Sequence, residues 1–162
     1  MSETIKVGMA DLKTCKAPDS VTTIGLGSCC GITLYDPVTK IGGLAHIMLP
    51  DSTAIRNNSN IAKFADTGID ELLRQVLALG ASKPRLVAKI AGGAKMFEVT
   101  GSVSSTINVG ERNAEASRKK LKELGIRLVA EDCGLNYGRT VTLDCNTGEY
   151  RIRSVGKEDK II

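Results

Sequence analysis

The segment of residues 25–31 combines glycines with a cysteine in an arrangement that suits a nucleophile. It reads Gly-Leu-Gly-Ser-Cys-Cys-Gly and follows a strand-like run that starts at residue 22. Glycines let the backbone turn sharply and leave nearby groups unshielded, so Cys29 can present its sulfur outward. Backbone N–H groups in such a turn can converge on a developing oxyanion. The segment predicts a nucleophilic Cys29, and the alternative role for this residue is a small buried thiol, since free cysteines are commonly buried.

Two rival sites fit the same residues less well. Gly-x-Gly begins a dinucleotide-binding fingerprint, but position 30 is Cys where a third Gly belongs, and β-branched residues follow instead of a helix. A zinc site is disfavoured because no Cys-x-x-Cys occurs and because adjacent Cys29 and Cys30 are awkward tetrahedral ligands. We therefore expect neither a cofactor nor a metal.

His46 is the only histidine in the chain, so any imidazole base must be this residue. It lies in a predicted strand, residues 41–49, where alternation places Leu44 and Met48 on the same face. A lone histidine in an apolar strand can also be a hydrogen-bonded core residue. The cysteine turn and the histidine strand can be neighbours in one sheet, however, and this favours a Cys–His catalytic pair.

The strands and helices predicted around this pair indicate one α+β domain spanning residues 1–162, with mixed β-sheets packed against helices. The strands nearest the pair have short connections, which favours antiparallel or mixed pairing among them. We expect a mobile loop over residues 51–60 and a frayed tail over residues 157–160. Strands are predicted at residues 22–27, 30–35, 41–49, 85–90, 126–130, 139–145 and 149–155, the last two joined by a hairpin turn, and helices at residues 64–77 and 111–124.

Composition restricts the partners and the compartment. Aromatic residues make up 3% of the 162 residues, and the net charge of +4 is spread without a run of Lys and Arg, which argues against nucleic-acid binding. No apolar stretch could span a bilayer, and the start lacks the apolar core of a signal peptide. We expect a cytoplasmic protein without membrane insertion. The five irregularly spaced cysteines then predict free thiols rather than disulfides.

Several segments together resemble the chemoreceptor glutamine deamidases, the CheD family, over nearly the whole chain. Two of them carry the candidate pair: Thr-Ile-Gly-Leu-Gly-Ser-Cys at residues 23–29 and Gly-Gly-Leu-Ala-His-Ile-Met-Leu-Pro at residues 42–50. Cys30 stands where the family usually has an aliphatic residue, and we expect it to point away from Cys29 into the core. Cys133-Gly134-Leu135 replaces what is often a Gly-Gly pair. The remaining segments, in family order and spacing, are residues 64–69, 89–97, 110–113, 130–132 and 138–139.

The resemblance implies a layered sandwich similar to that of cysteine deamidase toxins, with Cys29 as nucleophile, His46 as base and Thr23 as an assisting residue. It implies a protein-glutamine deamidase that converts Gln side chains of methyl-accepting chemotaxis receptors to Glu through a Cys thioester, with release of ammonia. A second implied partner is the CheC-type phosphatase that acts on CheY-phosphate. The alternatives are a receptor γ-glutamyl methyl esterase using the same thioester, and a non-catalytic binding partner of CheC.

Two further expectations concern accessibility. An imidazolium beside Cys29 would lower its thiol pKa from about 8.5, so we expect Cys29 to be accessible with a low pKa, and Cys30 and Cys145 to be buried. The glycines at residues 92–93, followed by Met96 and Phe97, predict a partner surface over residues 91–97, with a core role for Phe97 as the alternative.

Overall fold

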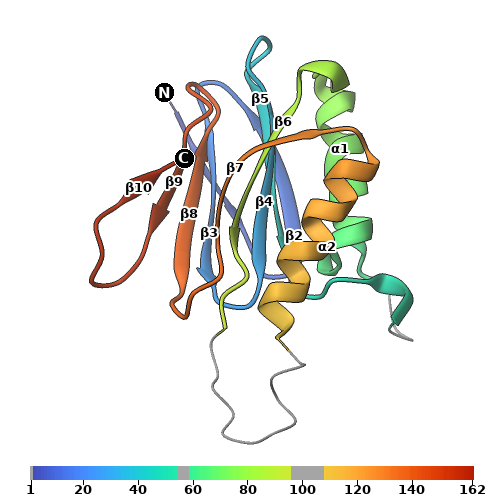
Figure 1. Ribbon diagram of the computed structural model, residues 1–162. Helices are drawn as coiled ribbons and strands as arrows, with labels where there is room; N and C mark the ends of the chain where they lie inside the picture. The colour runs from blue at the N-terminus through green and yellow to red at the C-terminus, as the bar shows by residue number, and fades with distance from the viewer. Residues whose placement is uncertain (1, 55–58, 96–107) are drawn as a thin grey trace, which may run out of the picture.

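Two mixed β-sheets lie face to face in the computed structural model, which describes residues 2–54, 59–95 and 108–162 (Figure 1). Among the described strands, the pairs β1–β3 and β6–β7 are parallel and the other pairs are antiparallel. Sheet A consists, in spatial order, of β1 (Thr4–Val7), β3 (Ser20–Leu26), β8 (Arg139–Asp144), β9 (Tyr150–Arg153) and β10 (Lys160–Ile161). Sheet B consists of β2 (Asp11–Lys16), β5 (Ile41–Ile47), β4 (Cys30–Asp36), β6 (Val87–Gly92) and β7 (Arg127–Cys133).

Sheet B is the central layer of the molecule. Sheet A covers one of its faces, and the helices α1 (Ala65–Leu79) and α2 (Val109–Glu123) cover the other (Figure 1). Every residue of β4 and β5 is therefore buried. Because side chains alternate along a strand, Leu44 and His46 face sheet A, whereas Ala45 and Ile47 face the helices.

Each helix buries one apolar stripe against sheet B. In α1 the buried positions follow the helical period, and the helix ends at Gly80, whose φ of 119° suits glycine. In α2 the side chain of Asn108 caps the first turn by accepting a hydrogen bond from the Glu111 N–H. No helix in the described ranges has the length and apolar character that crossing a membrane requires.

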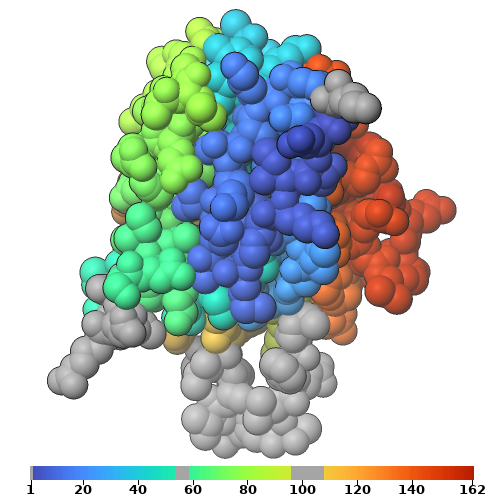
Figure 2. Space-filling model, turned by 180° about the vertical axis from the view of Figure 1, so that it is seen from behind, coloured from blue at the N-terminus to red at the C-terminus, as the bar shows by residue number. Residues whose placement is uncertain are grey.

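Strands β1 and β2 close the rear of the molecule. Figure 2 shows these two strands between α1 on one side and the C-terminal strands on the other. β1 pairs with β3 and β2 with β5, each as the edge strand of its own sheet, so the turn between β1 and β2 joins sheet A to sheet B at this edge. Neither was among the predicted strands, because both are short and carry few apolar residues.

The predicted α+β sandwich is confirmed, with three differences in detail. β4 and β5 pair antiparallel as expected, but β3 belongs to the other sheet, because the chain crosses between the sheets at residues 27–29. The tail is not frayed: β10 pairs with β9, and Lys89 Nζ donates to the backbone oxygen of Ile162. Within the expected loop over residues 51–60, Ser52–Ala54 forms a 3₁₀ turn, and residues 55–58 lie outside the described residues.

The predicted partner surface over residues 91–97 falls partly outside the described residues. Met96 and Phe97 are not described, so the roles expected for them stay predictions. The described part, residues 91–94, is buried, and Lys95 is exposed. The buried backbone of this segment packs against the turn that carries Cys29, as shown below.

The expectation of free thiols throughout was wrong for one pair of cysteines. Cys15 on β2 and Cys145, directly after β8, form a disulfide between the two sheets. The two residues are 130 positions apart in sequence, and only the packing of one sheet on the other brings them together. Cys29, Cys30 and Cys133 are free.

Candidate functional site

The turn between β3 and β4 carries Cys29 across from sheet A to sheet B, at the lower edge of the sheets in Figure 1. The register of β3 with β8 is irregular between Thr23 and Leu26, where Gly25 has a φ of 78°. All three carbonyls of the turn accept hydrogen bonds from neighbouring elements. The Gly27 oxygen accepts from Ala94 N, the Ser28 oxygen from Asn113 Nδ2 and the Cys29 oxygen from Gly93 N, each at 2.9 Å.

These three hydrogen bonds fix the direction of the turn's N–H groups. In a trans peptide the C=O of one residue and the N–H of the next point in opposite directions. The N–H groups of residues 28–30 therefore point away from β6 and α2. Gly92 makes the close packing possible: its φ is 105°, and a Cβ there would lie 2.2 Å from the Cys29 oxygen.

Cys29 and Cys30 lie on opposite sides of the chain, as expected. Cys30 is fully buried in the core under the helices, whereas Cys29 is half-buried and packs against the core between the sheets. Cys145 is also buried, as expected, but as part of the disulfide. Burial raises the pKa of Cys29, and the nearby backbone N–H offsets this only in part. The expected low thiol pKa is therefore wrong for this structure.

His46 reaches the space between the sheets from β5. It pairs with Gly31 of β4, two residues beyond Cys29. Because side chains alternate along a strand, Cys29 and Gly31 lie on the same face, the one toward sheet A. Thr23 of β3 meets it from the opposite sheet, with Thr23 Oγ1 2.7 Å from His46 Nδ1. The structure thus brings the predicted base and assisting residue into contact, with the predicted nucleophile at the adjoining strand end.

The hydroxyl of Thr23 determines which ring nitrogen of His46 carries the proton. Thr23 Oγ1 donates its one proton to the Val7 carbonyl at 2.8 Å, and a carbonyl can only accept. The Thr23 oxygen must then accept from the Nδ1–H of His46. The neutral ring is left with its lone pair on Nε2, which is buried and has no hydrogen-bond partner among the described residues.

The thiol and the imidazole are both uncharged near neutral pH. Burial lowers the pKa of His46, because a low-dielectric site disfavours the imidazolium. Burial raises the pKa of the Cys29 thiol for the same reason. The Cys29 thiol is not hydrogen-bonded to Nε2 in this structure. A neutral thiol that approaches this unprotonated nitrogen can react by proton transfer to it as the sulfur attacks.

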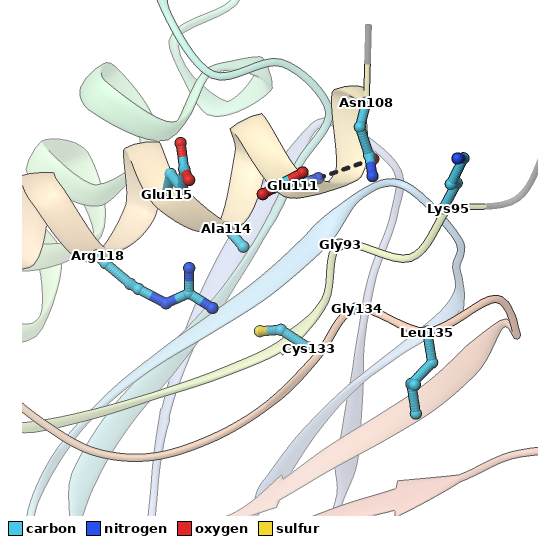
Figure 3. A pocket seen from close by; sticks show the side chains of 10 residues that line it. All are labelled: Gly93, Lys95, Asn108, Glu111, Ala114, Glu115, Arg118, Cys133, Gly134 and Leu135. Atoms are coloured by element: carbon cyan, nitrogen blue, oxygen red, sulfur yellow. Dashed lines mark hydrogen bonds between the residues drawn. The ribbon is translucent and has the colours of Figure 1, made fainter. Parts of the chain in front are cut away.

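A separate pocket of about 410 Å³ opens on the other side of Gly93, between α2 and the end of β7 (Figure 3). Its one thiol, Cys133, has a pKa raised to about 11, mainly by burial and also by the charge of Glu131. Such a thiol is a poor nucleophile at neutral pH. The pocket is lined by Gly93, Lys95, Asn108, Glu111, Ala114, Glu115, Arg118, Cys133, Gly134 and Leu135, without Cys29 or His46.

Two buried polar residues near the turn were not predicted as site residues. Arg139 is 1% exposed; its Nε pairs with Asp132 at 3.1 Å, and its Nη1 donates to the Gly134 carbonyl. Asn113, fully buried on α2, donates to the Ser28 carbonyl. Asn113 lies in the segment of residues 110–113 that resembles the CheD family, but its residue type alone gave no sign of its backbone partners. In the described ranges, no group of three His, Cys, Asp or Glu side chains could hold a metal ion.

Comparisons with known proteins agree with the resemblance found in the sequence. A family model described as CheD chemotactic sensory transduction matches residues 48–154. A probable chemoreceptor glutamine deamidase CheD of Lachnoclostridium phytofermentans is 59% identical over 162 residues, which cover 100% of each chain. Proteins of the same name are 51% identical in Caldanaerobacter subterraneus, over 99% of each chain, and 51% identical in Pyrococcus abyssi, over 96% of this chain and 94% of that one.

Proposed function

Because this chain belongs to the CheD family, we propose that it is a protein-glutamine deamidase that converts Gln side chains of methyl-accepting chemotaxis receptors to Glu. The relatives' name, probable chemoreceptor glutamine deamidase, supports the reaction and the substrate. One observation supports the chemistry above the others: Thr23 holds His46 with Nε2 unprotonated, at the strand pair that carries Cys29. We assign the catalytic unit to Cys29, His46 and Thr23, within one domain spanning residues 1–162.

The first half of the reaction forms a thioester. His46 Nε2 takes the thiol proton as the Cys29 sulfur attacks the carboxamide carbon, which forms a C–S bond and places negative charge on the amide oxygen. The backbone N–H groups of residues 28 and 29, which point away from β6 and α2, are the donors proposed for this oxyanion. The imidazolium then protonates the amide nitrogen. The C–N bond breaks, ammonia leaves and a γ-glutamyl thioester remains.

The second half returns the enzyme to its starting state. His46 Nε2 removes a proton from water as the water oxygen attacks the thioester carbon. The C–S bond breaks, the sulfur regains its proton from the imidazolium, and glutamate is released. Thr23 acts through His46 in both halves: by accepting the Nδ1–H it keeps Nε2 as the nitrogen that exchanges protons. No cofactor takes part in this scheme.

The proposed setting is bacterial chemotaxis. The receptor is the substrate and a CheC-type phosphatase is a second partner, as the family resemblance implies, in the cytoplasm. Each turnover replaces a neutral amide by a carboxylate, so the modified receptor segment gains negative charge and its packing equilibrium shifts. A receptor γ-glutamyl methyl esterase is the alternative function, because the same thioester would form with methanol as the leaving group.

The proposal is tested by incubating the protein with a purified receptor fragment and mapping Gln-to-Glu conversion by peptide mass spectrometry. Wild type should convert specific glutamines, and Cys29→Ala should convert none while keeping its circular dichroism spectrum. A parallel fragment carrying Glu methyl esters measures the alternative. Faster release of methanol than of ammonia favours the esterase. If folded wild-type protein cleaves neither the amide nor the ester, only a binding role remains.

A further inference from the structure

We infer that Asn113 is the positioning residue that sets the spacing between the nucleophile turn and the histidine strand. Its side chain is fully buried on α2, against the end of the sheet that carries both reactive groups. Nδ2 donates to the Ser28 carbonyl and to the Met48 carbonyl, each at 2.9 Å. Ser28 directly precedes Cys29, and Met48 lies two residues after His46. This inference rests on the proposed function, since it concerns the same catalytic pair.

The orientation of the amide follows from its neighbours. Both oxygens that face Asn113 belong to backbone carbonyls, which can only accept hydrogen bonds. The NH₂ group must therefore point toward them, and it supplies one proton to each. Oδ1 is left buried without a partner among the described residues. An orphaned buried acceptor is unfavourable, and the two donated hydrogen bonds offset this cost.

The two bonds join segments that the sheet alone does not hold together. β4 and β5 are paired from Cys30↔Ile47 onward, so Ser28 and Met48 lie just beyond the last pair of the ladder. At this point the chain enters β4 from the cysteine turn and leaves the end of β5 beside it. The ladder aligns Gly31 with His46. Asn113 bridges its open end from the helix layer and thereby holds the Cys29 turn against the segment that follows β5.

A positioning role predicts a loss in the chemical step rather than in substrate binding. A displacement of about 1 Å between reacting groups can lower a rate about 10²-fold. Asn113→Ala removes both donors, and Asn113→Asp keeps the shape while placing carboxylate oxygens against two carbonyl oxygens. We expect kcat to fall about 10- to 10²-fold in Asn113→Ala and further in Asn113→Asp, with KM within about threefold of wild type.

Ser117→Ala is the matched control. Ser117 lies one turn along the same buried face of α2, and its hydroxyl donates to the Asn113 carbonyl at 2.7 Å. This substitution removes one buried hydrogen bond without releasing either strand end. Its thermal unfolding temperature should fall, while its kcat stays near that of wild type.

The test combines kcat and KM on the receptor fragment with the rate of Cys29 alkylation by iodoacetamide as a function of pH. Alkylation requires no receptor, so the inference can be judged even where the proposed function fails. The Asn113 variants should show an altered alkylation profile, and Ser117→Ala a wild-type one. If Asn113→Ala does not fold, Asn113→Ser, which keeps one donor, should give an intermediate loss. A folded Asn113 variant with a wild-type alkylation profile and wild-type kcat, whatever its stability, would overturn the inference.

Discussion

At the scale of single residues, the site depends on how protons are distributed over one threonine, one histidine and one cysteine. The Thr23 hydroxyl is committed to the Val7 carbonyl, so it can only accept from His46. Burial keeps both His46 and Cys29 uncharged at neutral pH. In the proposed mechanism the thiol proton is therefore transferred during attack, unlike in cysteine enzymes in which a preformed ion pair lowers the thiol pKa to about 3–4.

This proton distribution predicts the pH dependence of kcat/KM. Protonated His46 cannot accept the thiol proton, and its pKa is lowered by burial, so activity should fall only below about pH 6.5. The thiol proton is the one that His46 later passes to the departing ammonia, so loss of this proton at high pH should also lower activity. Because the pKa of Cys29 is raised, this fall should occur only above about pH 8.5. The measurement is kcat/KM from about pH 5 to about pH 10. An acid limb near pH 4, with fast alkylation at pH 6, would instead indicate an ion pair.

Removal of the two reactive groups should show that they act as a unit. A nucleophile without its base is nearly inert, so Cys29→Ala, His46→Ala and the double variant should lose similar amounts of activity. His46→Ala should cost at least about 10²-fold, the low end for a general base. Thr23→Ala should cost less, because it loosens the orientation and tautomer of His46 but removes neither reactive group. Deamidation rates of the folded variants decide the matter: strictly multiplicative losses in the double variant would mean that the two residues work independently.

At the scale of elements, the nucleophile turn is held by backbone contacts from β6 and by one side chain from α2. The contact with β6 needs Gly92, since a Cβ there would lie 2.2 Å from the Cys29 oxygen. Gly134 is a natural comparison. It has a similar φ, 85° against 105° at Gly92, but a Cβ on Gly134 would meet nothing within 4 Å.

Alanine at these two glycines should separate backbone strain from displacement of the turn. Both substitutions force alanine into a left-handed conformation, at a cost of about 1–2 kcal/mol. Gly134→Ala should show this destabilisation and keep its kcat. Gly92→Ala should lose more stability and lower kcat by about 10²-fold, because the turn must move. Urea unfolding and the deamidation assay measure the two effects, and equal losses of kcat in both variants would contradict the role given to Gly92.

Sequence patterns predicted the elements that bury apolar stripes and missed those defined by long-range contacts. The first helix follows from its apolar spacing, the second from its early acidic and late basic residues, and the β8–β9 hairpin from Asn146-Thr147-Gly148. The assignment of β3 to the other sheet could not be read from strand propensity, because it depends on pairing with β8, more than a hundred residues away. The role of Asn113 was hidden for a related reason: its partners are backbone carbonyls, which carry no residue-type signal.

At the scale of the whole molecule, the Cys15–Cys145 disulfide links the two sheets across 130 residues of sequence. A crosslink of this span restricts the unfolded chain, and its loss typically costs about 2–5 kcal/mol. Wild-type protein should therefore melt at a lower temperature in dithiothreitol, while the Cys15→Ala/Cys145→Ala variant should be insensitive to the reductant. In denaturant without reductant, a thiol assay should count the three free cysteines. A count of five, with a melting temperature independent of reductant, would show that the bond does not form.

The position of β3 has a consequence for how the protein is made in the cell. β3 carries Thr23 and leads into the cysteine turn, and it lies between β1, at the start of the chain, and β8, which begins at Arg139. On the ribosome, β3 can pair with β1 at once but must wait for β8 until most of the chain has been synthesised. Nascent chains therefore carry Cys29 and His46 before β8 completes the sheet that holds Thr23. In a translation time course, deamidase activity should appear only after β8 has been synthesised.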